Sequence, residues 1–75
     1  MTDPWLLMTY NRDANCWMVY MDGRSYPMHC GEWFEIQIHE DKGITCTLEL
    51  DRDWFVIVRE ARFYLRKKDT YHIHI

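Results

Sequence analysis

Between residues 33 and 50, hydrophobic and polar side chains alternate along two segments that are joined by a short polar turn. The apolar residues that share one side are Phe34, Ile36 and Ile38 in the first segment and Ile44, Cys46, Leu48 and Leu50 in the second. A period of two residues is typical of half-buried antiparallel strands. The pattern therefore predicts a β-hairpin in the middle of the chain.

Similar apolar segments on both sides of this hairpin predict further strands. The six strands expected from the sequence span residues 5–10, 16–21, 33–39, 44–50, 54–59 and 71–75. Asp41-Lys42-Gly43 is expected to form the central turn, with Gly43 in the left-handed region. Pro27 argues against a central strand directly after residue 21. Residues 60–68 fit both a helical and a strand pattern, and we slightly favour a strand or irregular coil.

These elements predict an all-β (β-rich) fold in a single small domain that spans residues 1–75. Five or six short strands with tight turns are typical of a small antiparallel barrel or a strongly bent sheet. A barrel also removes the unpaired edges that are a liability in a small β protein. In the last strand the alternation is expected to turn Tyr71, Ile73 and Ile75 inward and His72 and His74 outward.

The length of 75 residues and the composition indicate a soluble, intracellular protein. No apolar run approaches the ~20 residues of a membrane span. The first residues, Met1 to Pro4, lack the basic start of a secretory signal. Three cysteines without a CxxC spacing are expected to be free thiols or metal ligands rather than a disulfide framework.

Acidic residues are concentrated in the middle of the chain. Residues 32–60 contain eight acidic and three basic residues, whereas residues 61–75 carry four basic residues and one acidic residue. An acidic surface suits a basic protein partner, such as a nucleic-acid-handling nuclease; a solvated sheet face is the simpler interpretation. The carboxylates predicted to contact such a partner are Glu35, Glu40, Asp41, Glu49, Asp51 and Asp53.

Four tryptophans, five tyrosines and three phenylalanines are many for a core of this size. Trp and Tyr are frequent anchors at protein interfaces. We therefore expect Trp33 and Trp54 to contact a partner, although both residues are equally compatible with an aromatic-rich core. The sequence leaves open whether the protein is a monomer or a homodimer.

No pattern of catalytic residues supports an enzyme. His29 and Cys30 are neighbours, and neighbours on an extended chain point in opposite directions, so this pair does not place a base on a nucleophile. Cys30 with His39 or His72 is still compatible with the sequence. There is no Gly-rich phosphate loop, GxSxG or HExxH motif. We expect a non-enzymatic protein without a small-molecule substrate.

Histidine spacing near the end of the chain raises the question of a metal site. His72 and His74 stand two residues apart on a predicted strand, so both rings project from one side about 7 Å apart. Together with His29 and Cys30, they are candidate ligands for a structural zinc ion. A metal would stabilise a chain this short. Solvated surface histidines are the competing interpretation.

A cluster of basic residues supports nucleic-acid binding as an alternative function. The candidate contacts are Arg62, Arg66, Lys67 and Lys68. Small β domains bind single strands with aromatic side chains and basic rims. The same four residues are also typical of an exposed loop that favours solubility.

Several segments resemble a known family. They are Tyr10-Asn11, the run from Met28 to Glu32, Phe34-Glu35-Ile36, the run from Leu48 to Ile57, and the run from Leu65 to Tyr71. The chain is similar to small domains of unknown function carried on conjugative elements, plasmids and prophages of Gram-positive bacteria. Members often begin the central block with Leu-His-Cys-Gly, where this chain has Met28.

The resemblance implies a context rather than catalytic residues. It suggests an accessory protein of a phage or mobile element that is located in the cytoplasm of the bacterial host. Small acidic proteins from that context resemble anti-CRISPR inhibitors, which bind a CRISPR nuclease and block its nucleic-acid channel. The function expected first is therefore inhibition of a host defence nuclease through the acidic, aromatic-rich surface.

Overall fold

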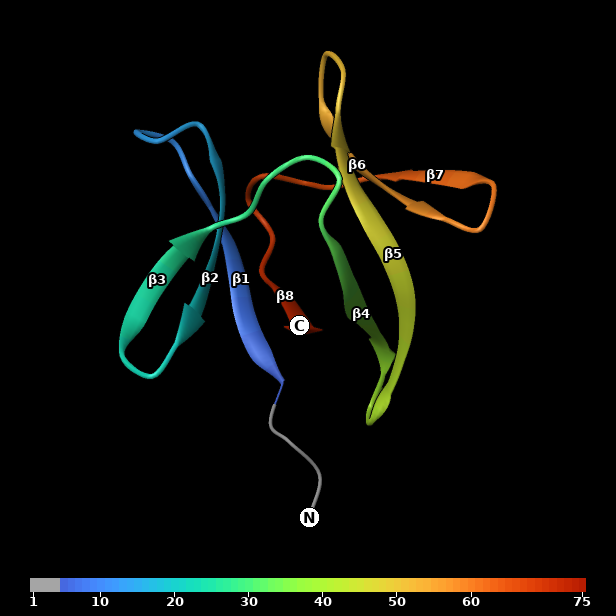
Figure 1. Cartoon of the computed structure of the whole chain (residues 1–75), viewed down its shortest axis with the longest axis horizontal. Helices are drawn as coiled ribbons and strands as arrows, with labels where there is room; N and C mark the ends of the chain where they lie inside the picture. The colour runs from blue at the N-terminus through green and yellow to red at the C-terminus, as the bar shows by residue number, and fades with distance from the viewer. Residues whose placement is uncertain (1–4) are drawn as a thin grey trace.

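The computed structural model describes residues 5–75, and the expectation drawn from Met1 to Pro4 lies outside this range. Every element is a β-strand (Figure 1). The strands are β1 (Leu6–Asn11), β2 (Cys16–Met21), β3 (Arg24–Pro27), β4 (Trp33–His39), β5 (Lys42–Leu50), β6 (Trp54–Val58), β7 (Ala61–Tyr64) and β8 (Tyr71–His74). No helix in residues 5–75 has the length and apolar composition needed to cross a membrane.

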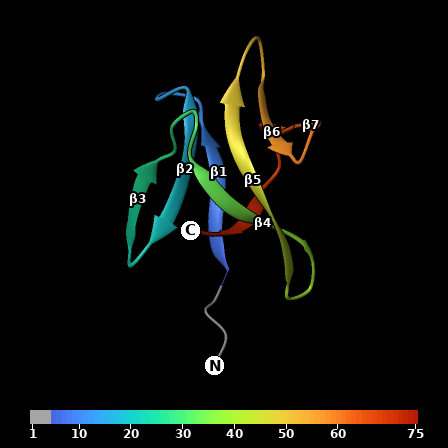
Figure 2. The same cartoon turned by 45° about the vertical axis from the view of Figure 1, so that its right-hand side comes forward.

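The eight strands form one antiparallel sheet in the order β3-β2-β1-β8-β4-β5-β6-β7. Strands β1 to β3 form one meander, and strands β4 to β7 form another. The last strand, β8, pairs with β1 on one side and with β4 on the other, so it joins the two meanders (Figures 1 and 2). The middle of the sheet is thus completed by the end of the chain.

The sheet bends around one hydrophobic core. Alternate residues of both meanders and of β8 belong to a single buried cluster, with Met8, Trp17, Leu48 and Ile73 completely buried. A flat sheet exposes both faces, so burial this complete requires the two halves of the inner face to cover each other. The predicted alternation is confirmed for Phe34, Ile36, Ile44, Cys46, Leu48, Tyr71 and Ile73.

The ends of three strands depart from this pattern. Ile38, Leu50 and Ile75 were expected on the buried side, but each is exposed. Ile38 lies at the irregularity in the pairing of β4 with β5, between Gln37 and His39. The period of two therefore predicts burial in the middle of each strand better than at its ends.

The expected strand number and the closed barrel need correction. The structure has eight strands instead of five or six, and β3 and β7 are the two open edges of the sheet. These additional strands are four residues long and exposed throughout, so they carry no burial pattern that a sequence reading can detect. Pro27 ends β3, which agrees with the restriction of proline to edge strands.

The turns also differ in one detail from the expectation. Asp22-Gly23 joins β2 to β3 with positive φ at both residues, as a tight hairpin requires. In the β4–β5 turn, the residue with positive φ is Glu40, and Gly43 already belongs to β5. Gly43 is needed for a different reason. A Cβ atom at this position would lie 2.7 Å from the Glu35 Cγ atom and 2.7 Å from the Trp5 ring.

Candidate functional site

The chain between β7 and β8 crosses from the edge of the sheet to its middle. We call residues 65–70 the crossing segment. The Leu65 N–H donates to the Trp54 carbonyl at 2.9 Å, and the Arg66 N–H donates to the Tyr71 hydroxyl at 2.9 Å. The Asp69 N–H donates to the Arg66 carbonyl at 2.9 Å. This last bond closes a turn that has Lys67 and Lys68 at its two central positions.

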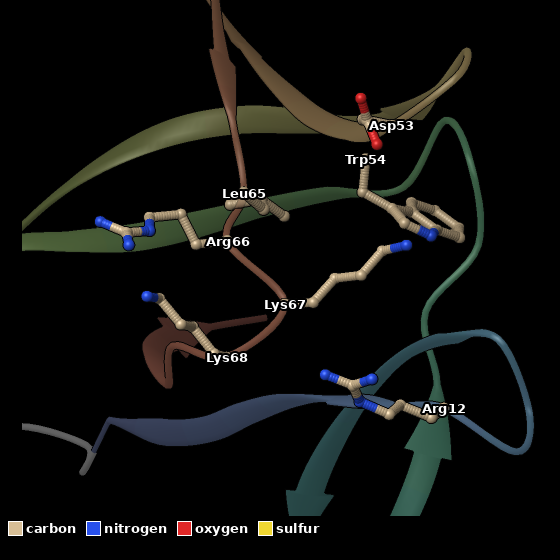
Figure 3. Close-up of a pocket in the computed structure, with 7 residues that line it drawn as sticks. All are labelled: Arg12, Asp53, Trp54, Leu65, Arg66, Lys67 and Lys68. Carbon is tan, nitrogen blue, oxygen red and sulfur yellow. The ribbon is translucent and has the colours of Figure 1, made fainter.

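A basic pocket of about 370 Å³ lies beside this turn (Figure 3). Four cations and one carboxylate line it together with two apolar side chains. The lining residues are Arg12, Asp53, Trp54, Leu65, Arg66, Lys67 and Lys68. Arg12 comes from the β1–β2 turn and Trp54 from the start of β6, and these two parts of the chain lie at the same end of the molecule (Figures 1 and 2). We refer to it below as the basic pocket.

Most of these cations have no carboxylate partner among the residues that the structure describes. Among residues 5–75, Arg66 forms an ion pair with Asp69 at 3.7 Å, whereas Arg12, Lys67 and Lys68 form none within 4.0 Å. The Lys67 Nζ atom lies 5.0 Å from the centre of the Tyr10 ring. In Figure 3 the Lys67 side chain extends toward Trp54, and the Arg12 guanidinium points into the same space. The pocket therefore presents concentrated positive charge to an anion.

Arg62 was predicted to belong to this basic group, but the structure places it elsewhere. Its Nη1 atom lies 3.3 Å from the Asp51 Oδ2 atom, and its guanidinium lies over the Phe55 ring at 4.8 Å. The Tyr64 hydroxyl donates to the same Asp51 oxygen at 3.3 Å. These contacts lower the pKa of Asp51, and the largest cause is the hydrogen bond from the Asp53 N–H. Hydrogen bonds from the Arg52 N–H and Tyr64 and the charge of Arg62 lower it further.

The acidic residues predicted to contact a partner do not lie together. Glu40 and Asp41 form the β4–β5 turn, whereas Asp51 and Asp53 lie in the β5–β6 turn. These turns are at opposite ends of the nine-residue strand β5, which spans about 30 Å at 3.3 Å per residue. Asp53 lines the basic pocket. The predicted acidic surface is thus divided between two ends of the molecule.

The two predicted tryptophan anchors have different surroundings. Trp33 is 72% exposed at the start of β4, as an interface anchor would be. Trp54 is 7% exposed and packs in the core cluster, with one side available to the basic pocket. The core interpretation therefore applies to Trp54, whereas the contact of Trp33 with a partner stays a prediction.

Glu35 is held on the outer face of the sheet by an aromatic pair. Its Oε1 atom lies 3.2 Å from the His74 Nδ1 atom. The His74 ring stacks on Trp5, with ring centres 3.8 Å apart and planes 2° from parallel. Gly43 provides the space for Glu35 and Trp5 beneath this stack. The arrangement packs the first described residue of the chain against the last strand.

The four candidate zinc ligands do not form one cluster. His29 and Cys30 lie in the loop between β3 and β4, where the His29 Nδ1 atom is 2.9 Å from the Glu32 Oε1 atom. His72 and His74 lie on β8, and His74 interacts with Trp5 and Glu35. Within residues 5–75, no three His, Cys, Asp or Glu side chains are arranged to hold a metal ion.

The three cysteines are free thiols, as the sequence indicates. Cys46 is in the core, and burial raises its pKa to about 12, so its thiol stays neutral at physiological pH. Cys30 is exposed in the β3–β4 loop, and Cys16 is partly buried at the start of β2.

The sequence identified only part of the basic pocket. Arg66, Lys67 and Lys68 were found as a run of basic residues, whereas Arg12 was missed because it lies more than fifty positions away. No local signal connects Arg12 to this run. The connection comes from β8, which pairs with β1 and thereby draws the crossing segment toward the β1–β2 turn.

A comparison with protein families gives one match. The family model described as "Domain of unknown function (DUF5348)" matches residues 7–75, which is nearly the whole chain. No curated protein and no solved structure gives a significant match.

Proposed function

The chain belongs to the DUF5348 family of domains of unknown function, and we propose that it binds single-stranded nucleic acid through the basic pocket. One observation carries this proposal. Arg12 joins Arg66, Lys67 and Lys68 around a single pocket, and three of these four cations have no ion-pair partner within residues 5–75. Nucleic-acid affinity depends mainly on cations that neutralise phosphates.

The compact shape of the basic group favours a single strand over a duplex. Duplex binding uses an extended basic surface that follows two backbones. Here the four cations line one pocket of a chain whose net charge is −3, and carboxylates of the β4–β5 turn at the far end of β5 would repel a long duplex. A flexible strand can place one or two phosphates at the lysine turn and direct its bases elsewhere.

The proposal is tested by fluorescence anisotropy with a labelled oligothymidine of about ten nucleotides, within the range bound by small β domains. We expect binding that weakens as salt is raised. The double variant Lys67→Ala/Lys68→Ala should make the negative slope of log K against log[salt] shallower by roughly 1.4, at about 0.7 for each lost phosphate contact.

The matched control is the double variant Arg24→Ala/Lys42→Ala, which removes two cations outside the pocket. It should retain the affinity and salt slope of the parent protein. Absence of binding at low salt, or equal losses in the two double variants, would refute the proposal.

A protein partner is the second candidate, because Trp33 is so exposed. Trp33 pairs with Thr47, and Glu35 and Glu49 lie two positions further along β4 and β5, respectively, on the same outer face. We propose that the protein, encoded by a phage or mobile element, inhibits a defence nuclease of the host. In this case the outer face around Trp33 would contact the nuclease. Tryptophan is one of the residues enriched at binding hot spots.

This candidate is tested with a purified CRISPR nuclease immobilised for biolayer interferometry. The parent protein should bind, and Trp33→Ala should weaken binding at least tenfold, which is about 1.4 kcal/mol. Tyr26→Ala, a change of another exposed aromatic residue on the opposite part of the sheet, is the control. No binding by the parent protein would count against this inhibitor function.

A further inference from the structure

A second pocket lies next to the basic pocket and has the opposite chemistry. It encloses about 290 Å³ and is lined mainly by aliphatic residues of β4, β5 and β6. Phe63, Tyr64 and Tyr71 add aromatic surface, and Gln37 contributes the only amide side chain. None of its ten lining residues is charged. We call it the apolar pocket.

The two pockets share one lining residue of the crossing segment. Leu65 lines both of them. Tyr71 lines the apolar pocket, and its hydroxyl accepts the hydrogen bond from the Arg66 N–H that fixes the start of the lysine turn. A ligand that follows the crossing segment therefore meets positive charge on one side of Leu65 and apolar surface on the other.

We propose that the apolar pocket receives one unstacked base of the strand whose phosphates occupy the basic pocket. This inference rests on the function proposed above and specifies which part of the ligand enters which pocket. A nucleotide joins an anionic phosphate to a flat, mainly apolar ring, which matches the two neighbouring surfaces. Bases of single strands are typically splayed out onto aromatic side chains in this way.

The edge strand β7 makes the apolar pocket accessible. Phe63 is 55% exposed and Tyr64 is 54% exposed, although both are large aromatic residues on a sheet edge. Tyr64 pairs with Phe55, and its hydroxyl and ring contact Asp51 and Phe55, so its side chain lies on the other side of β7 from that of Phe63. Phe63 forms no ring pair with another aromatic residue among residues 5–75, which leaves its ring available to a base.

The test compares an oligothymidine with an abasic strand of the same length, so that the phosphates are unchanged and only the bases are removed. Both strands are titrated by anisotropy into the parent protein, Phe63→Ala and the control Tyr26→Ala. Tyr26 is the matched residue because it is an exposed aromatic residue of the other edge strand. Phe63→Ala should still fold, since its side chain lies outside the core cluster.

We expect the parent protein to bind the oligothymidine more tightly than the abasic strand by about five- to a hundredfold, the range for stacking one base. Phe63→Ala should remove most of this preference, whereas Tyr26→Ala should keep it. Equal affinity for both strands, or a preference that survives Phe63→Ala, would overturn the base-pocket inference.

The two proposals fail in different ways. If both strands bind equally and salt weakens both, the basic pocket stands and the base pocket does not. If neither strand binds at low salt, the nucleic-acid function itself fails. A preference lost equally in Phe63→Ala and Tyr26→Ala would also overturn the inference, because it would show a general effect of removing an edge aromatic residue.

Discussion

The charged groups at the β5–β6 turn have partners within the protein, whereas most of those in the basic pocket form no ion pair among residues 5–75. Asp51 accepts hydrogen bonds from the Asp53 N–H at 3.0 Å, from Tyr64 and from Arg62. Lys67 and Lys68 have no carboxylate within 4.0 Å among residues 5–75. The first region uses its charge to fix a turn of the fold, whereas the second leaves its charge available to a ligand.

This difference indicates that the net charge of the chain does not predict the charge of its partner. The acidic majority suggests a basic partner, but Glu35 and Asp51 are engaged by His74 and Arg62 of the same molecule. The cations are fewer, yet four of them line one pocket. Charges that are already paired contribute little to a new contact, because their partners must first be displaced.

Charge reversal in the lysine turn should produce the largest effect. In Lys67→Glu/Lys68→Glu, two phosphate contacts are replaced by repulsion, so oligothymidine affinity should fall by more than about a hundredfold at low salt. The free energy of unfolding should change by less than about 0.5 kcal/mol, because exposed side chains without ion pairs contribute little to stability. Anisotropy and urea denaturation measure the two quantities.

The control for charge reversal is Arg24→Glu/Lys42→Glu, which makes the same change of net charge outside the pocket. It should lower affinity only through the general field of the protein. A loss as large as that of the lysine-turn variant would show that net charge, and not the pocket, governs binding.

Gly43→Ala should destabilise the region that holds Glu35. The added methyl group would meet the Glu35 side chain and the Trp5 ring at 2.7 Å, so both must move. We expect a loss of about 1–2 kcal/mol in the free energy of unfolding, typical of overpacking. Urea denaturation tests this, with Thr45→Ala in the same strand as the control. Unchanged stability would show that Trp5 and Glu35 yield without cost.

Asp51→Asn should change the response of stability to acid. The folded pKa of Asp51 is below its ordinary 3.8, so the carboxylate stabilises the fold above that pH and loses this contribution as the pH falls through the folded pKa. The parent protein should therefore melt at a higher temperature than Asp51→Asn at neutral pH, with the gap closing below about pH 3.8. A gap that does not depend on pH would contradict this account.

Arg62→Ala should have the smallest effect on nucleic-acid binding. Its guanidinium is paired with Asp51 and lies outside the basic pocket, so oligothymidine affinity should stay within about twofold of the parent value. Arg12→Ala removes one cation that lines the pocket and is the matched comparison. Equal losses in these two variants would show that the run of basic residues matters and the pocket does not.

The long strands were predictable because their residues alternate between a buried and an exposed side. The predicted segment 33–39 coincides with β4, and 44–50 lies within β5. Strand β3 was not predicted, and β7 lies in residues 60–68, where a strand or irregular coil was slightly favoured over a helix; exposed four-residue edge strands have no such alternation. Their place in the sheet depends on pairing with β2 and β6, which is information from distant parts of the chain.

The candidate site was predictable only where its residues are neighbours in sequence. The run Arg66-Lys67-Lys68 stands out in the sequence. Arg62 is only four positions before this run, but nothing in the sequence shows that its side chain pairs with Asp51. Trp54 was expected either as an anchor for a protein partner or as a core residue, and it packs in the core cluster with one side on the basic pocket. The contact of Arg62 with Asp51 depends on the pairing of β7 with β6, whereas the meeting of the crossing segment with Arg12 depends on β8, which lies between β1 and β4.

The most direct test of the basic pocket is a titration of ¹⁵N-labelled protein with unlabelled oligothymidine, followed by amide chemical shifts. We predict that the largest shifts fall in three separate segments: the β1–β2 turn at Arg12, the start of β6 at Trp54, and the crossing segment at residues 65–69. Shifts confined to the outer face around Trp33, or no shifts at low salt, would contradict the account.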